Sequence, residues 1–511
     1  MYSNTRESFK KFTDEETFSK IVDFDTVSQM WANCVKEYPE RIAIEYNGEA
    51  HTFGALEKDA AGFRTVLASR GIGRGDHVGI FSANSYDFVK AYIAAVTMGA
   101  VAVILPAQLD DKSIFGCCMK YSLKALVYQA GLAGKTEFAK EKLGNVAFIG
   151  IEELSDTAAP IVETEGSDRC VIMFTGGTTG KSKGAILSNR AVMTGTVNGC
   201  YGYEQVFGNR YLLVLPLSHV FGLIRNLMTS LYTGSTLFIC MDNKDMFRNC
   251  AEFRPTILVM VPALAEMALT LSKKFGRNML GSDMKYIICG AAAVPPYLIE
   301  EYGKMGISLY PGYGLTESAN LVSGNPESAG RPDSVGKLYP YEEVDIVDGE
   351  IRIRGNNMME GYWGEDEENA ASYEDGWFKT GDLGYVDEEG FLYITGRKKE
   401  VIVLQSGENI SPAELEIKFN ELKFIQDSQV FEAENASGKR ILALEVVLRV
   451  TEIKDAESEE TKEFVMKELG KVNMTLPEYA RVSRIIIRKE DFARTPSMKI
   501  KRYSEIIKLA D

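Results

Sequence analysis

The sequence predicts an α/β protein with two units: a large N-terminal unit of doubly wound α/β subdomains plus a small β-barrel, and a small, mobile α+β unit at the C-terminus. Its 511 residues exceed the roughly 250–300 at which one hydrophobic core stops growing. From about residue 24 to 395, helical stretches alternate with short β-branched runs. After about residue 331 the runs shorten and are separated by glycine and acidic turns, which indicates antiparallel strands.

The first part of the chain contains the predicted parallel strands. HVGIFSA (77–83) and AVAVILP (100–106) are apolar enough to be buried on both faces, and an apolar helix is predicted between them, over 86–98. The series of predicted strands continues with ALVYQA, RCVIMFT, TLFIC, TILVMV and YIICGA. This order of elements predicts a doubly wound layer.

The last part of the chain predicts two further structures. EVDIVDGEIRIRG and YVDEEGFLYITG suggest a small barrel or antiparallel sheet over about 331–395. From Lys399 onward, strands such as RILALEVVLRV alternate with acidic, lysine-rich helices. We therefore expect domains at 1–398 and 399–511, with the short polar connection GRKKEV as a hinge at Lys399.

Composition excludes several classes of protein. Lys and Arg total 57 against 72 Asp and Glu, and this net charge of −15 would repel a nucleic-acid backbone, so no nucleic-acid partner is expected. The N-terminus has no apolar signal region and no run reaches about 18 apolar residues, which predicts a cytoplasmic chain without a transmembrane segment. Eight cysteines without a C-x-x-C pair and three histidines argue against a zinc enzyme.

A glycine-rich loop is the most informative segment. In RCVIMFTGGTTGKSKGAILSN (169–189), a predicted strand leads into four glycines, three threonines and two lysines. Glycine lets backbone N–H groups approach phosphates, threonine hydroxyls add donors, and lysine adds charge. The segment predicts a polyphosphate site.

Two other motifs nearly match this loop. The G-x-x-x-x-G-K-[ST] phosphate loop would need glycine at Thr175 and a helix directly after Lys181-Ser182, whereas Gly184 and AILS predict a turn and a strand, with a helix only from Ser188 or Asn189. A G-x-S-x-G nucleophile elbow would need an acid and then a histidine downstream, and only His219 follows. Both alternatives are disfavoured.

The loop and the motifs downstream resemble the adenylate-forming (AMP-binding) superfamily, which includes acyl-CoA synthetases, firefly-type luciferases and peptide-synthetase adenylation domains. The matches follow in family order: TGGTTGKSKG, LPLSHVFG, CGAAAV, GYGLTES, EIRIRGNNMMEGYW, GWFKTGDLG, ITGRKKEV, SGENISPAELE and ARTPSMKIKR. Gly176 and Ser182 replace the family's usual Ser and Pro, and Met498 replaces the glycine before the family's lysine. The ordered set is what makes the resemblance specific.

The resemblance implies a site for ATP and Mg²⁺. It places Tyr313 against adenine, Thr316 near the α-phosphate, Glu317 on the magnesium ion, and Asp382 and Arg397 on the ribose hydroxyls. The remaining implied ATP- or AMP-binding residues are Thr175, Gly176, Gly177, Thr178, Thr179, Gly180, Lys183, Gly290, Ala291, Ala292, Gly314 and Ile394.

The resemblance also implies two steps. Lys499 would bridge the substrate carboxylate and the α-phosphate, Lys399 would act as the hinge, and Gly407 would line the entry for coenzyme A. The loop between Lys399 and Gly407 is one residue longer than in many relatives.

The acid is expected to be a fatty or aryl acid. His219 stands where amino-acid-activating relatives carry Asp, and Val220 follows it; Gly290 and Gly314 are the other implied substrate residues. The sequence therefore predicts activation of a carboxylic acid to acyl-AMP and transfer to coenzyme A. Transfer to an acyl carrier protein, and a nucleotide-binding regulatory protein without turnover, remain the alternatives.

Overall fold

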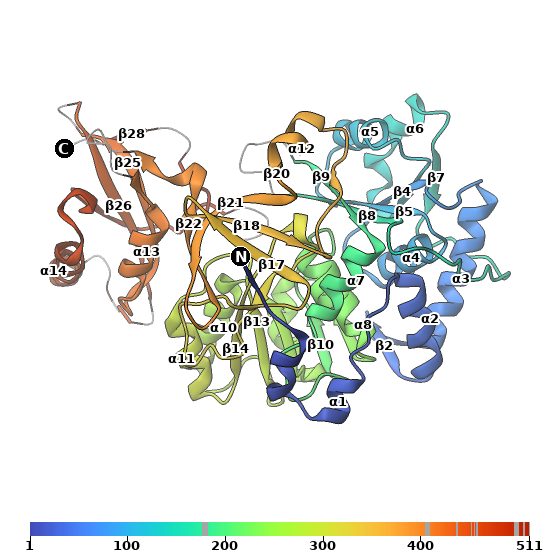
Figure 1. Ribbon diagram of the computed structural model, residues 1–511, viewed down its shortest axis with the longest axis horizontal. Helices are drawn as coiled ribbons and strands as arrows, with labels where there is room; N and C mark the ends of the chain where they lie inside the picture. The colour runs from blue at the N-terminus through green and yellow to red at the C-terminus, as the bar shows by residue number, and fades with distance from the viewer. Residues whose placement is uncertain are drawn as a thin grey trace.

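The computed structural model describes residues 1–175, 182–403, 409–435, 438–450, 452–453, 455, 458–494, 500–503 and 506–509. A large lobe contains two sheets with helices packed around them, and a smaller C-terminal lobe, orange to red in Figure 1, lies to one side. None of the helices in these described ranges is both long and apolar enough to cross a membrane.

The first sheet confirms the earliest predicted strands. Its order is β19-β9-β8-β5-β4-β6-β7, parallel from β8 to β7, with β9 and β19 antiparallel. The strands are β4 (His77–Phe81), β5 (Val101–Leu105), β6 (Ala125–Tyr128), β7 (Ala147–Gly150), β8 (Arg169–Phe174), β9 (Gly184–Ser188) and β19 (Gly361–Tyr362).

The second sheet joins a parallel part to an antiparallel part. The parallel part runs in the order β2-β11-β10-β12-β13-β14, with β3 (Glu49–Thr52) antiparallel at its edge. Its strands are β2 (Ile42–Tyr46), β10 (Arg210–Leu213), β11 (Thr236–Ile239), β12 (Ile257–Met260), β13 (Tyr286–Cys289) and β14 (Ser308–Tyr313).

The predicted antiparallel region is confirmed, and it is continuous with β14 through β15. Beyond β15 the order is β16, β22, β21, β18, β17 and β1, and β20 pairs with β21. The strands are β1 (Tyr2–Ser3), β15 (Ser323–Gly324), β16 (Gly336–Leu338), β17 (Glu342–Val347), β18 (Glu350–Gly355), β20 (Tyr373–Glu374), β21 (Trp377–Val386) and β22 (Phe391–Arg397).

Apolar helices join the two sheets into one core. Helix α4 (Tyr86–Thr97), predicted over 86–98, is buried almost all round because it contacts β4 and β5 of one sheet and β2 of the other. The other helices of the large lobe are η1 (Arg6–Phe12), α1 (Glu15–Ser19), α2 (Val27–Glu37), α3 (Phe53–Ser69), α5 (Asp111–Lys120), η2 (Ala130–Lys135), α6 (Glu137–Lys142), α7 (Asn189–Asn198), the π-helix η3 (Phe221–Met228), α8 (Thr229–Tyr232), η4 (Asn243–Asp245), α9 (Met246–Phe253), α10 (Pro262–Phe275), α11 (Pro296–Lys304), η5 (Thr316–Ser318) and α12 (Asp366–Ser372).

The C-terminal lobe has its own core, built mainly from a sheet of order β27-β26-β25-β28 and two helices. It contains β25 (Ile425–Glu434), β26 (Arg440–Leu448), β27 (Arg484–Arg488), β28 (Ile507–Lys508), α13 (Pro412–Asn420), α14 (Glu459–Thr475) and η7 (Glu478–Ala480). Between the lobes lie η6 (Lys398–Glu400) and the pair β23 (Ile402–Val403) and β24 (Asn409–Ile410).

Candidate active site

Several of the predicted site residues that the structure describes lie where parallel strands of the second sheet end. Gly290 directly follows β13, and Tyr313 is the last residue of β14. In open α/β sheets, ligands bind outside the carboxyl ends of the strands. The antiparallel strands β21 and β22 bring Asp382 and Arg397 to the same place.

Glycine and alanine leave the backbone at these strand ends bare of large side chains, and at Gly314 neighbouring backbone fills the room that a side chain would take. A Cβ on Gly314 would lie 1.3 Å from the Asn320 carbonyl oxygen, so no side chain fits there. A Cβ on Gly290 would lie 3.1 Å from the Gly312 carbonyl oxygen. Ala291 has a φ of +67°, a left-handed conformation that favours glycine.

Asp382 is the centre of one polar group. The Tyr313 hydroxyl donates to Asp382 Oδ2 at 2.8 Å, and Arg397 Nε donates to Asp382 Oδ1 at 2.7 Å. Asp382 is only 4% exposed. Burial and the Asp382 charge raise the pKa of Tyr313, so the phenol keeps its proton. Burial lowers the pKa of Arg397, but the negative charge and hydrogen bond of Asp382, together with Tyr313 and Glu400, more than offset this, and the net pKa is raised.

Glu317 is the centre of a second group. Its Oε1 accepts from the Tyr362 hydroxyl at 2.6 Å, and Tyr362 lies on β19, which pairs with β9 next to the phosphate loop. Lys183 lies 4.9 Å from the centre of the Tyr362 ring and forms an ion pair with Glu368. Thr316, adjacent to Glu317, is buried. Tyr362 therefore connects the metal-ligand candidate to the lysine of the phosphate loop.

The two ends of the phosphate loop form a hairpin. The Thr175 backbone N–H donates to the Lys183 carbonyl at 2.9 Å, and Ser182 Oγ donates to the Thr175 carbonyl at 2.8 Å. Strand β9 follows at Gly184 and helix α7 begins only at Asn189, which confirms the prediction that disfavoured a G-x-x-x-x-G-K-[ST] loop. Gly176, Gly177, Thr178, Thr179 and Gly180 lie outside the described residues.

His219 lies just before η3, at the edge of this region. Its Nδ1 accepts from the Phe221 backbone N–H at 3.2 Å, and Val220 is buried. The Phe221 ring would be 3.6 Å from a Cβ on Gly290. This contact brings the predicted substrate residues close to the bare backbone at the end of β13.

The remaining predicted residues belong to the connection and the C-terminal lobe. Ile394 lies on β22, Ala292 follows Ala291 after β13, and the Lys399 side chain is exposed in η6. Ser411 Oγ, at the start of α13, donates to the Thr395 carbonyl at 2.7 Å, so the two lobes touch beside Arg397. Lys499 and Gly407 lie outside the described residues.

Comparison with known proteins agrees with this arrangement. Residues 31–363 match the family described as "AMP-binding enzyme", and residues 399–510 match "AMP-binding enzyme C-terminal domain". The chain belongs to the AMP-binding enzyme family.

Curated members of the AMP-binding enzyme family include two close matches in sequence. The indoleacetate–CoA ligase of Aromatoleum aromaticum is 30% identical over 407 residues, 74% of this chain and 79% of the relative. The long-chain-fatty-acid–CoA ligase FadD15 of Mycobacterium bovis is 29% identical over 423 residues, 68% of this chain and 70% of the relative.

Among solved AMP-binding enzymes, the o-succinylbenzoate CoA synthetase MenE of Bacillus subtilis is 26% identical to this chain. Its complex with the acyl-adenylate OSB-AMP superposes with a TM-score of 0.76, covering 93% of this chain and 96% of MenE. Its complex with ATP and a magnesium ion gives a TM-score of 0.77.

One site residue of this AMP-binding enzyme was not predicted. Tyr362 stands in the motif EIRIRGNNMMEGYW, but nothing in its spacing shows that it reaches Glu317, which lies 45 residues earlier. The sequence shows only a tyrosine inside a family motif. A tyrosine in such a position can equally be a core residue, so the motif alone does not assign Tyr362 to the site.

Proposed function

We propose that this protein is an ATP-dependent acid–CoA ligase that forms an acyl-AMP and then an acyl-CoA thioester. The observation that carries the proposal is the convergence of the Asp382 and Glu317 groups on bare backbone at the ends of β13 and β14. The relatives named above are CoA ligases, and solved MenE holds an acyl-adenylate.

The described residues fit ATP and magnesium. Asp382 accepts one bond on each oxygen, which leaves lone pairs for the ribose hydroxyls, and Arg397 keeps donors besides Nε. Glu317 accepts from Tyr362 on one oxygen, and a carboxylate oxygen is a ligand that Mg²⁺ prefers. The lack of a side chain at Gly314 lets the Asn320 backbone pack against it, which holds Tyr313 and Thr316 in place on either side of the turn.

The reaction would have two steps. The acid's carboxylate oxygen would attack the α-phosphorus of ATP, the bond to the bridging oxygen would break, and pyrophosphate would leave. A Mg²⁺ ion held by Glu317 would neutralise the charge of the polyphosphate. A thiol then attacks the acyl carbon and AMP leaves. We assign Lys499 to the first step and Gly407 to thiol entry in the second. The boundary between the two domains would lie at 398/399. Lys399 would be the hinge about which the C-terminal domain rotates, so that Lys499 faces the site in the first step and Gly407 faces it in the second.

The proposed substrate is a fatty or aryl acid without an α-amino group. The relatives reported above are named for long-chain fatty acids, indoleacetate and o-succinylbenzoate. In this chain His219, Val220 and Phe221 provide an imidazole and apolar surface in place of a carboxylate that would hold an ammonium group.

The test is pyrophosphate release with ATP and Mg²⁺ over a panel of fatty, aryl and amino acids, with coenzyme A, with acyl carrier protein, or with neither. We expect AMP as the nucleotide product, a response to non-amino acids, and thioester only with coenzyme A. ADP as the main product, or no release with any acid, would contradict the proposal. Thioester on the carrier protein alone would reassign the acceptor.

A further inference from the structure

One side chain of the C-terminal lobe is buried against the large lobe. Arg449 directly follows β26, and its Nε lies 2.8 Å from Oε1 of Glu266 on helix α10. The two side chains are only 8% and 15% exposed. This ion pair is therefore buried between two separate hydrophobic cores.

Arg449 is held from several sides. Its guanidinium lies 4.2 Å from the centre of the Tyr297 ring on α11, a cation–π contact with the large lobe. Its Nη1 donates to the carbonyl of Lys423, within its own lobe. When one member of a buried ion pair is removed, the other remains as an uncompensated charge, which is strongly unfavourable. Separation of the lobes at this point would break the ion pair and expose both charges to water, which offsets part of the lost attraction.

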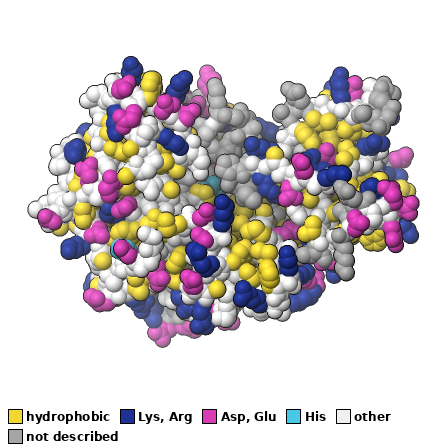
Figure 2. Space-filling view, turned by 180° about the vertical axis from the view of Figure 1, so that it is seen from behind, with side chains coloured by type: hydrophobic (Ala, Val, Ile, Leu, Met, Phe, Trp, Pro, Cys, Tyr) yellow, Lys and Arg dark blue, Asp and Glu magenta, His cyan; other side chains and the backbone are white. Residues whose placement is uncertain are grey.

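The surroundings of the pair are polar and incompletely packed. Lys273 on α10 lies 2.8 Å from Glu301 and 3.9 Å from Glu452 of the C-terminal lobe. A cavity of about 120 Å³ lies beside these side chains. Figure 2 shows the C-terminal lobe on the right, with charges of both signs near the place where the lobes meet. Polar contacts of this kind allow domains to move relative to one another.

We propose that Arg449 is a positioning residue: its contacts with Glu266 and Tyr297 hold the C-terminal lobe in this orientation for one half-reaction and must break for the other. The part of this inference that concerns half-reactions depends on the proposed function. The part that concerns orientation depends only on the contacts between the lobes. The two parts are tested separately.

The orientation is tested by the distance between two spin labels in the full-length protein without substrate. Labels go on Lys58→Cys of α3 and Lys467→Cys of α14, both exposed positions, in a Cys117→Ser background because the other seven cysteines are buried. We expect Arg449→Met to change the ratio of the two lobe orientations by about tenfold, the usual scale of such coupling. Arg440→Met is the matched control, because Arg440 is on β26 and pairs with Glu432 inside its own lobe.

Glu266→Gln tests the same pair from the large lobe, in case Arg449→Met does not fold. Glu266→Gln should shift the spin-label distances in the same direction as Arg449→Met does. In the double variant it should cause little further shift, because the ion pair is already lost. Unchanged distances in both single variants would overturn the proposal.

The kinetic readout uses the best acid from the pyrophosphate panel, in single-turnover measurements of each half-reaction. Loss of Arg449 should slow one half-reaction and leave the other unchanged or faster. An equal loss in both would show that Arg449 is only structural and would overturn its positioning role. If no acid releases pyrophosphate, the proposed function fails, whereas the distance measurement still decides the orientation.

Discussion

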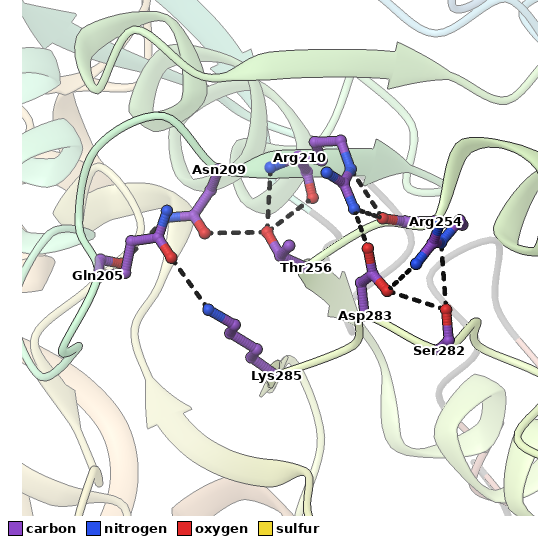
Figure 3. A network of polar contacts seen from close by, with 8 residues as sticks. All are labelled: Gln205, Asn209, Arg210, Arg254, Thr256, Ser282, Asp283 and Lys285. Carbon is purple, nitrogen blue, oxygen red and sulfur yellow. Dashed lines mark hydrogen bonds and ion pairs between the residues drawn. The ribbon is translucent and has the colours of Figure 1, made fainter.

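Two groups of polar residues lie at opposite ends of the parallel strands of the second sheet, one at the amino ends of β10, β12 and β13 and the other at the carboxyl ends of β13 and β14. At the amino ends, Figure 3 shows a network that contains Gln205, Asn209, Arg210, Arg254, Thr256, Ser282, Asp283 and Lys285. Asp283 accepts from Arg210 and Arg254, each at 2.6 Å, and Arg210 also donates to the Arg254 carbonyl. These groups form hydrogen bonds and ion pairs with one another and so link the amino ends of the three strands.

At the carboxyl ends, the polar groups converge on a bare backbone. Asp382 and Glu317 each accept from a tyrosine hydroxyl, beside Gly290 and Gly314, where a side chain is crowded or excluded. The comparison teaches that a carboxylate with arginine partners is not in itself a sign of function. What distinguishes Asp382 from Asp283 is burial beside a tyrosine hydroxyl: the side chain of Asp382 is 5% exposed, against 28% for Asp283.

The largest effect is expected at Gly314. Gly314→Ala would place a Cβ 1.3 Å from the Asn320 carbonyl oxygen, so the backbone between Tyr313 and Thr316 must shift. A misplacement of this kind costs about 10²-fold in rate. ATP–pyrophosphate exchange measures it, with Gly303→Ala on α11 as the control, because a Cβ there meets nothing within 4 Å. Equal activity of the two variants would contradict the inference that the site requires the absence of a side chain at Gly314.

The next effect compares the two aspartates directly. Asp382→Asn leaves the partly exposed Arg397 beside a neutral amide and should weaken apparent ATP affinity by about 1.5–3 kcal/mol, roughly 10- to 100-fold. Asp283→Asn should lower the melting temperature and leave the KM for ATP unchanged. The KM for ATP and the melting temperature are measured for both variants. A similar rise in KM in both would break the comparison.

A smaller effect is expected at Tyr362. Tyr362→Phe removes the hydroxyl that donates to Glu317, a hydrogen bond to a charged group worth about 1.5–3 kcal/mol, part of which water would recover. We expect the Mg²⁺ concentration for half-maximal activity to rise about tenfold. Tyr385→Phe, at an exposed position on β21, is the control. A magnesium titration identical to that of the unaltered protein would show that Tyr362 does not orient Glu317.

The smallest effect is a pH dependence at the amino ends. Hydrogen bonds from Arg254, then Ser282 and Arg210, lower the pKa of Asp283 to about 2. A carboxyl whose pKa is lower in the folded state stabilises the protein above its unfolded pKa, and that stability is lost as pH falls. The difference in melting temperature between the unaltered protein and Asp283→Asn should therefore shrink from pH 5 to pH 3. A constant difference would show that the ionised form is not what the network stabilises.

Local patterns were sufficient for the order and kind of the main elements. Continuous apolar runs predicted β4, β5 and β12, and the turn after Lys183 predicted that α7 begins late. The family motifs brought Tyr313, Glu317 and Asp382 together in the prediction, and the structure brings them to the same strand ends. These signals are visible in sequence because each depends on neighbouring residues.

The pairing of distant elements was decided only by tertiary structure. The register of β21 and β22 makes Arg397 the partner of Asp382, whereas sequence assigned both residues only to the ribose. Arg449 and Glu266 are 183 residues apart, and no local pattern relates them. Such contacts form because the packing of whole strands and helices determines which side chains meet. Hydrophobic periodicity indicates which face of an element is buried, but it does not indicate which other element covers that face.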